Sequence, residues 1–491
     1  MNYSLLAPEI LLTLAGLVVV IMGLLMSDKS KNMLGYLSAA ALLASLVAVI
    51  SIKGTESMFY NAVVVDPLSQ IFKLIFIVVS LIAVIASIYY FKNNRSQDEY
   101  YALILFATVG MMVVASANDL ITLFVGFELA SMSTYVLAGF EKKNPASLEA
   151  ALKYFIIGSL SSALMLFGMS LLYGVTGSTN IPAIIEFFKE PMVTANSISI
   201  VAIVFLIAGF GFKMALVPFH MWAPDTYEGA PSVVSSLLAA GSKKMGFIAA
   251  FRILVLLAVV AVQLRVEIHL VFAILAIITM TYGNIVAISQ RSIKRMLAYS
   301  SIAQAGYISL AFVVTTQMSI AGGILLALGH GLMKGGAFIA VAMVGYMVLS
   351  NNKNATNTDD IDNFKGLGKR APITAFAILV FFLALAGIPP SAGFVGKFVL
   401  FYSVTIAAIN QASNWLLIVV IIAILNSALS IYYYARVIRY MYVLPPEGEK
   451  IREPTPYVVA ILLAVIGTIG IGLYPEPFIN WAMNAASVLG V

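Results

Sequence analysis

The feature that most constrains this chain is a series of apolar runs that recurs from one end of the sequence to the other. Each run is long enough to cross a bilayer, whose hydrocarbon core of about 30 Å takes about 20 apolar residues in a helix. Of the 491 residues, 61% are hydrophobic and 10% are charged, whereas soluble domains carry about 25% charged residues. The sequence therefore predicts an all-α polytopic membrane protein.

We predict about fourteen transmembrane helices from these runs. They cover residues 5–26, 33–52, 68–91, 100–116, 119–140, 149–174, 198–218, 232–257, 267–288, 296–315, 319–350, 372–407, 413–442 and 456–474. No interval between the runs is long or polar enough to hold a soluble domain. Residues 1–491 are therefore predicted to form a single transmembrane domain.

The basic residues between the runs are distributed unevenly. If each gap takes the number of the helix before it, the odd gaps hold fifteen lysines and arginines and the even gaps hold three. Short cytoplasmic loops carry such an excess of basic residues, so the odd gaps, including the polar loop 351–370, are predicted to be cytoplasmic. Both termini are then outside. The first helix has no basic segment before it and is followed by Lys29 and Lys31, so we predict an uncleaved anchor.

Two of the predicted helices contain prolines that break them. The seventh ends in LVPFHMWAP, with Pro218 and Pro224, and the twelfth contains AGIPPSAGF, with Pro389 and Pro390. Proline removes a backbone donor, and broken backbone at membrane depth is tolerated only against protein or a water-filled cavity. The breaks lie five helices apart, as in an inverted five-helix repeat. We therefore predict helices 1–3 at 1–92, repeat one at 100–257, repeat two at 267–442, and helix 14 with the C-terminus at 456–491.

Charged side chains deep inside apolar runs are the candidate functional residues. A charge at the bilayer centre costs about 2.5–3.5 kcal/mol on insertion scales, and such residues usually mark ion or proton pathways. The deepest charges are Glu128, Lys213, Lys243, Lys334 and Lys397, and Glu128 is the only acid that lies deep in an apolar run. We expect Glu128 to pair with Lys213. Desolvation and charge attraction act in opposite directions on such a pair, so either partner can change its protonation state near pH 7.

The remaining charges are weighed against structural roles. His330 lies one turn before Lys334 on the same helical face. Its position fits a proton carrier and a residue that forms a helix–helix hydrogen bond equally well. Lys153, Lys73 and Lys244 also fit lysines that snorkel to the interface, and Lys153 is kept as a candidate. Arg252 is predicted to be a snorkelling anchor. Asp225 and Glu228 are placed on the outer side, where they cap the returning helix.

Several classes of function are excluded by composition. The chain has no cysteine, which excludes thiolate metal sites and iron–sulfur clusters. Its three histidines show no metal-ligand spacing, and no Gly-rich phosphate loop is present. The net charge is +6, and most basic residues between the predicted helices lie in the odd gaps. This distribution indicates membrane topology and not nucleic-acid binding. We expect no cofactor and no metal in this chain.

Four motifs resemble one family of membrane proteins. They are PFHMWAPDTYEGAP (218–231), LLAAGSKKMGF (237–247), YSSIAQAGY (299–307) and AGIPPSAGFVGKF (386–398). They are similar to the antiporter-like membrane subunits of respiratory complex I, and LLAPEILL near the N-terminus and residues 151–174 resemble the N-type subunit. LGHGLMKGGAF (328–338) instead resembles the L-type, M-type and cation-antiporter pattern. M-type relatives carry glutamate where Lys397 stands.

The resemblance implies a fold, a function and partners. It implies fourteen helices with two inverted repeats, and it places the family's glutamate on Glu128 and its lysines on Lys213, Lys243 and Lys397. The expected function is proton translocation within an NADH:quinone oxidoreductase or an archaeal relative in a bacterial or archaeal plasma membrane. Flavin, iron–sulfur clusters and the quinone site are expected in partner subunits, both hydrophilic and membrane-embedded. The alternatives are a subunit of a multisubunit cation/proton antiporter and a scaffold subunit of a membrane hydrogenase-type complex.

Overall fold

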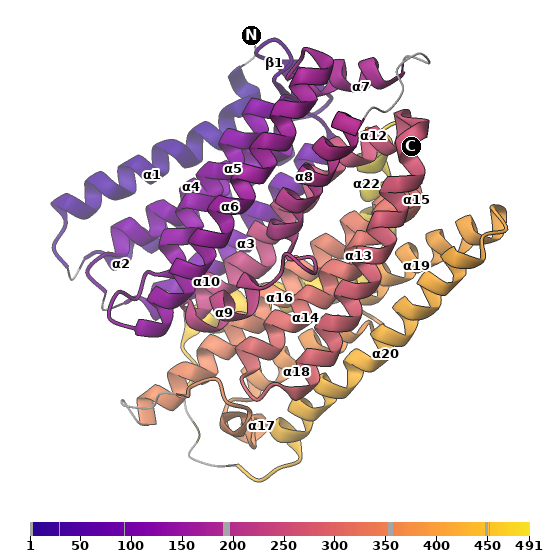
Figure 1. Cartoon of the computed structure of the whole chain (residues 1–491). Coiled ribbons are helices and arrows are strands. Elements are labelled where there is room, and N and C mark those ends of the chain that lie inside the picture. The colour runs from indigo at the N-terminus through magenta and orange to yellow at the C-terminus, as the bar shows by residue number, and fades with distance from the viewer. Residues whose placement is uncertain are drawn as a thin grey trace.

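The computed structural model describes residues 3–28, 30–92, 94–189, 197–351, 357–446, 450 and 452–491, and nearly all of them are helical (Figure 1). Lys29 and residues 352–356 of the polar loop lie outside the described residues. The all-α prediction is confirmed.

The first half of the chain holds the following elements. They are η1 (Tyr3–Leu6), α1 (Ala7–Leu25), α2 (Asn32–Ser51), β1 (Glu56–Met58), β2 (Val63–Val65), α3 (Pro67–Tyr90), α4 (Gln97–Ser116), α5 (Leu120–Ala138), α6 (Pro145–Thr176), α7 (Ile181–Lys189), α8 (Ser197–Met214), α9 (Trp222–Gly229), α10 (Ser232–Leu237), η2 (Leu238–Ser242), α11 (Lys243–Ala250), η3 (Phe251–Val255) and α12 (Leu256–Val260).

The described residues of the second half continue with helices alone. They are α13 (Val262–Ser289), α14 (Ile293–Ser309), α15 (Ala311–Val314), α16 (Gln317–Asn351), η4 (Ile361–Phe364), α17 (Leu367–Arg370), α18 (Pro372–Ala386), α19 (Ala392–Asn410), α20 (Asn414–Tyr442), α21 (Thr455–Leu473) and α22 (Glu476–Ser487).

Thirteen helices within the described residues are long and apolar enough to cross a membrane, and α18 is a shorter apolar helix. Residues 232–260 form a further helical stretch that includes two π-helical segments, η2 and η3. This stretch carries Lys243, Lys244 and Arg252, and all three are buried. The count of fourteen and the inverted repeats stay predictions.

Both proline-containing segments interrupt their helices, as predicted. The first helix of the seventh segment, α8, ends at Met214 before a cis Val217–Pro218 bond, and α9 begins at Trp222. In the twelfth segment α18 ends at Ala386, and α19 begins at Ala392 after a cis Pro389–Pro390 bond. The short α7, α22 and the β1–β2 hairpin were not predicted, because each is too short to give a transmembrane signal.

The connections gather at two ends of the molecule. At one end, which we call the hairpin end, the β1–β2 hairpin meets the loops before α5 and α7, since Asn118 N–H donates to Ala62 O at 2.9 Å and Asn180 Nδ2 donates to Asn61 O at 3.2 Å. At the other end, the loop end, Ile293 N–H donates to Asp359 O at 2.8 Å. Even gaps therefore meet at the hairpin end and odd gaps at the loop end, as alternating helices require.

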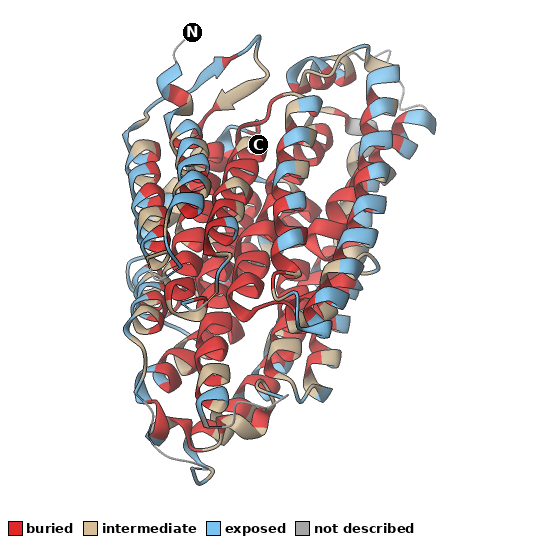
Figure 2. Cartoon of the chain, turned by 90° about the vertical axis from the view of Figure 1, so that its left-hand side faces the viewer, coloured by how far each residue is buried: buried red, intermediate tan, exposed pale blue. Residues whose placement is uncertain are grey.

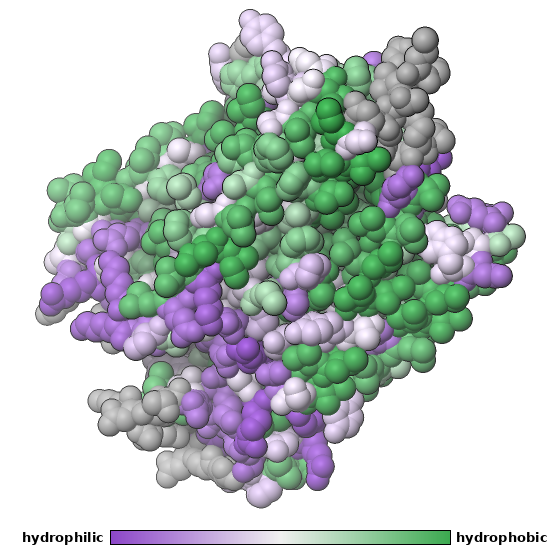
Figure 3. All heavy atoms as spheres, in the orientation of Figure 1, coloured by the Kyte–Doolittle hydropathy of each residue, from purple (hydrophilic) through white to green (hydrophobic). Residues whose placement is uncertain are grey.

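The surface between the two ends is apolar. Figure 2 shows buried residues on the inward sides of the helices and exposed residues around the outside. Many exposed residues are large and apolar, for example Leu14, Leu17 and Ile21 of α1. In Figure 3 hydrophobic atoms cover the middle of the visible face, while hydrophilic residues concentrate toward the loop end. This is the distribution that a bilayer selects.

Two buried ion pairs near the hairpin end correct the sequence-based account. Arg252 donates to both carboxylate oxygens of Asp66 at 2.6 and 2.8 Å, and the two side chains are 4% and 1% exposed. The predicted snorkelling of Arg252 is therefore wrong. Lys73 Nζ lies 2.7 Å from Glu9 Oε1 as an ion pair whose angles fall outside hydrogen-bond geometry. Lys73 is thus no snorkelling lysine, and Glu128 is not the only acid inside the helical bundle.

Candidate functional site

Lys213 lies in the last turn of α8 and is fully buried. Its Nζ donates to Ser131 Oγ and to Tyr154 OH, both at 2.9 Å. The rings of Phe127, Tyr135 and Tyr154 surround the ammonium at 5.1–5.6 Å from their centroids, a separation at which aromatic faces attract cations. Lys213 is thus held by hydroxyls and aromatic rings.

The predicted pair of Glu128 with Lys213 is wrong. Glu128 is partly exposed on α5, and its Oε1 accepts a hydrogen bond from Ser162 Oγ of α6. Lys213 instead contacts Ser131, three residues further along α5, and no ion pair joins the two charges among the described residues. The reason is helix placement: α6 packs against both α5 and α8, so its side chains provide nearer partners for both charges.

The hydroxyl of Tyr154 is held in place by the break after α8. Its ring stacks on Trp222 at 4.5 Å between centroids and 17° between planes. Trp222 Nε1 donates to Phe212 O at 2.9 Å, one of the carbonyls near the end of α8. Tyr154 OH also lies 3.3 Å from Thr134 Oγ1. The role of Tyr154 was not predicted, because a tyrosine within an apolar run gives no signal of its own.

Two consecutive lysines of α11 point to different helices. Lys243 Nζ donates to Ser301 O at 3.1 Å and to Ser301 Oγ at 2.9 Å. Lys244 Nζ donates to Ala239 O at 2.7 Å and lies 2.6 Å from His330 Nδ1. The predicted snorkelling of Lys244 is wrong, because α11 has helices on every side and Lys244 is fully buried. The π-helical η2 directly precedes the two lysines, and such segments often occur at functional sites.

A glycine lets α8 and α11 touch between the first two lysines. A Cβ at Gly246 would lie 2.9 Å from Met214 Cγ and 3.1 Å from Lys213 Cβ. Gly246 is one turn after Lys243, so the backbones that carry Lys213 and Lys243 approach closely here. A larger residue would separate the two helices.

Lys334 of α16 is fully buried and faces α14. Its Nζ donates to Ser300 Oγ at 2.7 Å and to Leu297 O at 3.2 Å. Ser300 Oγ is also hydrogen-bonded to Tyr434 OH of α20. His330 lies one turn before Lys334, with its Nδ1 on Lys244. Its Nε2 is buried and has no hydrogen-bond partner within the described part of the chain.

Lys397 lies at the second helix break. Its Nζ donates to Leu385 O at 2.9 Å, to Ala386 O at 3.2 Å and to Ser427 Oγ at 3.0 Å. It also lies 4.7 Å from the centroid of the Tyr307 ring. The two carbonyls belong to the end of α18, where the last turn leaves acceptors free and the helix dipole favours a cation. The break therefore creates the site for this lysine.

Helix α14 connects the sites of three lysines. Ser301 contacts Lys243, Ser300 contacts Lys334, and Tyr307 lies beside Lys397. Gln304 Nε2 donates to Leu385 O at 2.9 Å, the carbonyl that also accepts from Lys397. All four α14 side chains are buried. The YSSIAQAGY motif supported the family resemblance, but no role was predicted for its polar residues.

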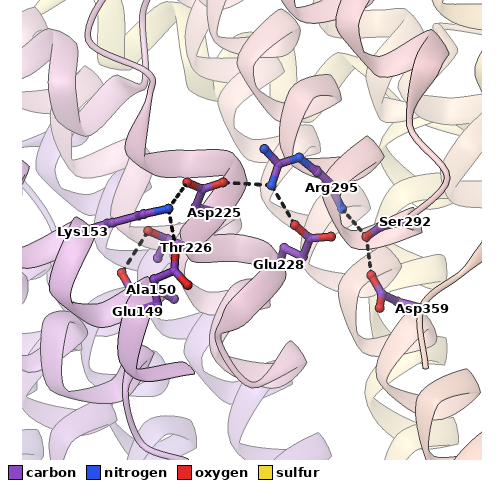
Figure 4. Close-up of polar contacts among 9 residues, drawn as sticks. All are labelled: Glu149, Ala150, Lys153, Asp225, Thr226, Glu228, Ser292, Arg295 and Asp359. Atoms are coloured by element: carbon purple, nitrogen blue, oxygen red, sulfur yellow. Dashed lines mark hydrogen bonds and ion pairs between the residues drawn. The ribbon is translucent and has the colours of Figure 1, made fainter. Parts of the chain in front are cut away.

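Lys153 lies apart from the buried lysines, in an ion-pair network at the loop end (Figure 4). Its side chain is 43% exposed, and its Nζ lies 2.7 Å from both Glu149 and Asp225. Arg295 bridges Asp225 at 2.8 Å and Glu228 at 2.7 Å. Asp225 and Glu228 therefore lie at the loop end, where the odd gaps meet, and their predicted placement with the even gaps is wrong. The short α9, which follows the helix break, brings them there.

The network fixes the charge of Asp225. Burial alone would raise the pKa of its carboxyl, but hydrogen bonds from Lys153 and Arg295 outweigh burial and lower the pKa below its ordinary value. A cavity of about 1170 Å³ lies at the loop end and is lined by residues of this network. Its polar lining includes Lys153, Asp225, Glu228 and Arg295. Within the described residues no cluster of histidine and carboxylate side chains could hold a metal ion.

Comparisons with known proteins identify relatives along the full length. A sequence model of the family described as "NADH:quinone oxidoreductase/Mrp antiporter, TM" matches residues 117–429. The F(420)H(2) dehydrogenase subunit N of Methanosarcina mazei is 55% identical over 99% of this chain and 98% of its own. The NADH-quinone oxidoreductase subunit N of Trichlorobacter lovleyi is 38% identical over the same shares.

Solved structures also match this chain over nearly its full length. A chain of respiratory complex I from Thermus thermophilus matches with a TM-score of 0.79 and 28% identity over 96% of this chain and 98% of that chain. A chain of the Mrp complex from Dietzia matches with a TM-score of 0.80 but 19% identity, over 100% of this chain and 98% of that chain, and therefore supports the fold alone.

Proposed function

The chain belongs to the NADH:quinone oxidoreductase/Mrp antiporter transmembrane family, and from this we propose that it is the N-type proton-translocating membrane subunit of a complex I-like dehydrogenase. Electron transfer takes place in partner subunits, which carry the flavin, iron–sulfur clusters and acceptor site. The chain contributes to the enzyme by moving protons. The relatives that are subunits N of redox complexes support this assignment.

We also propose the electron donor. The relative named F(420)H(2) dehydrogenase subunit N is 55% identical, against 38% for a relative named NADH-quinone oxidoreductase subunit N. The higher identity favours a reduced deazaflavin, F420H2, over NADH as the donor of the whole complex. The proposed location of the complex is a prokaryotic plasma membrane.

One observation carries the proposed function. Lys213, Lys243, Lys334 and Lys397 are all buried, and each is held by hydroxyl or carbonyl oxygens. None of the four forms an ion pair with a carboxylate among the described residues. A buried lysine without a counter-ion is costly to keep charged, and charged residues kept at such depth usually mark ion or proton pathways. A lysine locked to a carboxylate would hold its proton.

The geometry suggests the order of transfer. Lys213 takes up a proton from the loop side, and the close approach at Gly246 leads to Lys243 on α11. Helix α14 then connects Lys243 with Lys334 and Lys397 through Ser301, Ser300 and Gln304. The cavity at the loop end, with Lys153 in its lining, provides the polar surface from which protons arrive. Redox-driven acidification by the assembled complex tests this proposal.

The second candidate is a subunit of a multisubunit cation/proton antiporter. The Mrp complex supports the shared fold, and the same buried lysines would serve that activity. The proteins that co-purify with the chain discriminate the candidates. Iron–sulfur and flavin subunits support the dehydrogenase, and small membrane subunits alone would support the antiporter.

Orientation is a separate proposal: the loop end is cytoplasmic, and both termini lie outside. Tyr60 in the hairpin is 98% exposed, and Asn357 is exposed at the loop end. Because the chain has no cysteine, Tyr60→Cys and Asn357→Cys provide single labelling sites. In right-side-out vesicles an impermeant thiol reagent should label Tyr60→Cys and leave Asn357→Cys unlabelled until the vesicles are opened. The reverse pattern would invert the proposed topology.

Glu128 is expected to act as a hydrogen-bonded acid that influences Lys213 without touching it. Its contact with Ser162 lets both a carboxylate and an amide accept, so Glu128→Gln keeps the contact but removes the charge. Glu128→Asp keeps the charge. We expect Glu128→Gln to reduce redox-linked pumping more than Glu128→Asp, with assembly checked by native gel. Equal activities of the two variants would show that the charge of Glu128 has no role, and Ser162→Ala would then measure the contact alone.

A further inference from the structure

Lys243 and Lys244 are adjacent in sequence but begin two different connections. Lys243 reaches Ser301 on α14, whereas Lys244 reaches His330 on α16. Helix α16 returns to α14 one turn after His330, where Lys334 contacts Ser300. Ser300 and Ser301 are neighbours. Two series of contacts therefore start at the two lysines of α11 and end at neighbouring residues of α14. We call each series an arm.

The contact between Lys244 and His330 allows a proton to cross it. With Lys244 Nζ 2.6 Å from His330 Nδ1, an ammonium can donate to a neutral ring. The same two atoms can also be joined by a protonated ring that donates to a neutral amine. Both states use one set of heavy-atom positions, so no side chain has to move when the proton crosses.

Burial limits the charge of this pair. Both side chains are 0% exposed, and no carboxylate contacts either one among the described residues. Lys243 and Lys334 add further amines nearby. Two adjacent cations in such surroundings are strongly disfavoured, so the pair holds at most one excess proton. A proton that arrives at Lys244 is shared with His330.

The second ring nitrogen of His330 gives this proton a way out. Nε2 is buried and no described group of the protein accepts from it. When Nδ1 receives a proton, Nε2–H becomes acidic and can release its own proton on the opposite side of the ring. The ring then returns to neutrality as the other tautomer.

We propose that Lys244 and His330 form a second proton-carrying arm of the relay, from α11 through α16 to Lys334. The N–H bond of the Lys244 ammonium breaks as the Nδ1–H bond forms. The Nε2–H bond then breaks, and a water molecule accepts this proton and passes it to neutral Lys334. Charge and protons balance at each step. The inference rests on the proposed function, and it adds Lys244 to the residues that carry the proton.

The test uses glutamine variants that preserve the hydrogen bond and remove proton exchange. In Lys244→Gln the amide N–H still donates to His330, and in His330→Gln the amide oxygen still accepts from Lys244. Each variant is assembled in the full complex, reconstituted in proteoliposomes, and assayed for protons translocated at a fixed rate of electron supply. We expect pumping to fall roughly twofold in both variants, because each removes a proton-transfer group while the arm from Lys243 through Ser301 stays in place.

Three comparisons make the result decisive. Wild-type pumping in both glutamine variants would overturn the arm and leave a structural hydrogen bond. Because the variants lie on different helices, His330→Gln stays informative if Lys244→Gln lowers assembly. Lys213→Met is assayed in parallel: if it also pumps normally, the proposed function fails, whereas loss in Lys213→Met alone removes only the second arm. Lys142→Met, at an exposed loop position, is the matched control and should pump as wild type.

Discussion

Replacing Lys213 with methionine is expected to abolish donor-driven turnover while the complex still assembles. Methionine is unbranched and fills irregular apolar space well, so it occupies the pocket formed by Phe127, Tyr135 and Tyr154. It cannot bind a proton. We expect electron transfer from donor to acceptor to fall by roughly 10²-fold or more, the usual contribution of a proton-transfer group.

The control for this variant is assembly. Tyr154 should keep its place because Trp222 and not Lys213 fixes its ring. A native gel and the melting temperature of the purified complex should therefore match those of wild type. Normal turnover in an assembled Lys213→Met complex would remove Lys213 from the relay.

The second large effect is expected at Lys397. Its three hydrogen-bond partners are two carbonyl oxygens and one serine hydroxyl, so the site accepts hydrogen bonds from any donor group that stands there. Alanine provides no donor, so Leu385 O keeps only the hydrogen bond from Gln304 Nε2 and Ala386 O only the one from Ser427 Oγ. A protonated glutamic acid can donate to one of them and can release and regain its proton. We therefore expect Lys397→Glu to retain more pumping than Lys397→Ala.

This comparison separates a proton carrier from a structural lysine. Turnover and assembly are measured for both variants, and Lys397→Ala should lose most of its activity. Equal loss in the two variants would indicate that the ammonium is needed for its shape and charge. Full activity of Lys397→Ala would place the proton exit elsewhere.

The positions of the four central lysines could be predicted because the bilayer limits the choices. A lysine that is ten residues from either end of an apolar helix cannot reach water, so Lys243 and Lys334 had to be buried. Pro218 and Pro389 predicted the two helix breaks. A lysine next to a helix break is expected to reach the carbonyl oxygens freed there, and Lys397 does so.

Partners between helices were not predictable, because sequence does not give the order in which helices pack. Glu128 and Lys213 seemed matched in charge and depth, but α6 lies against both of their helices and binds each charge separately. For the same reason the contact of Lys244 with His330 was not predictable. Depth alone does not show that α16 covers its side of α11.

Two acidic residues near helix ends are buried, although their positions in the sequence indicate contact with water. Glu9 and Asp66 lie at the starts of α1 and α3, where water would be expected, yet each is buried by a cation from another helix. Lys153 shows the converse case. It lies nine residues into α6 and is still half-exposed, because it reaches the ion-pair network of α9 at the loop end.

The most direct test of the central claim is the number of protons translocated per electron pair. The complex is reconstituted in proteoliposomes, and electron flow and pH change are recorded together for wild type, Lys213→Met and Lys397→Ala. The proposed relay predicts that wild type acidifies the hairpin side as electrons flow, and that both variants lose this acidification at any residual electron flow. Wild-type numbers of protons per electron pair in both assembled variants would contradict proton translocation through this chain.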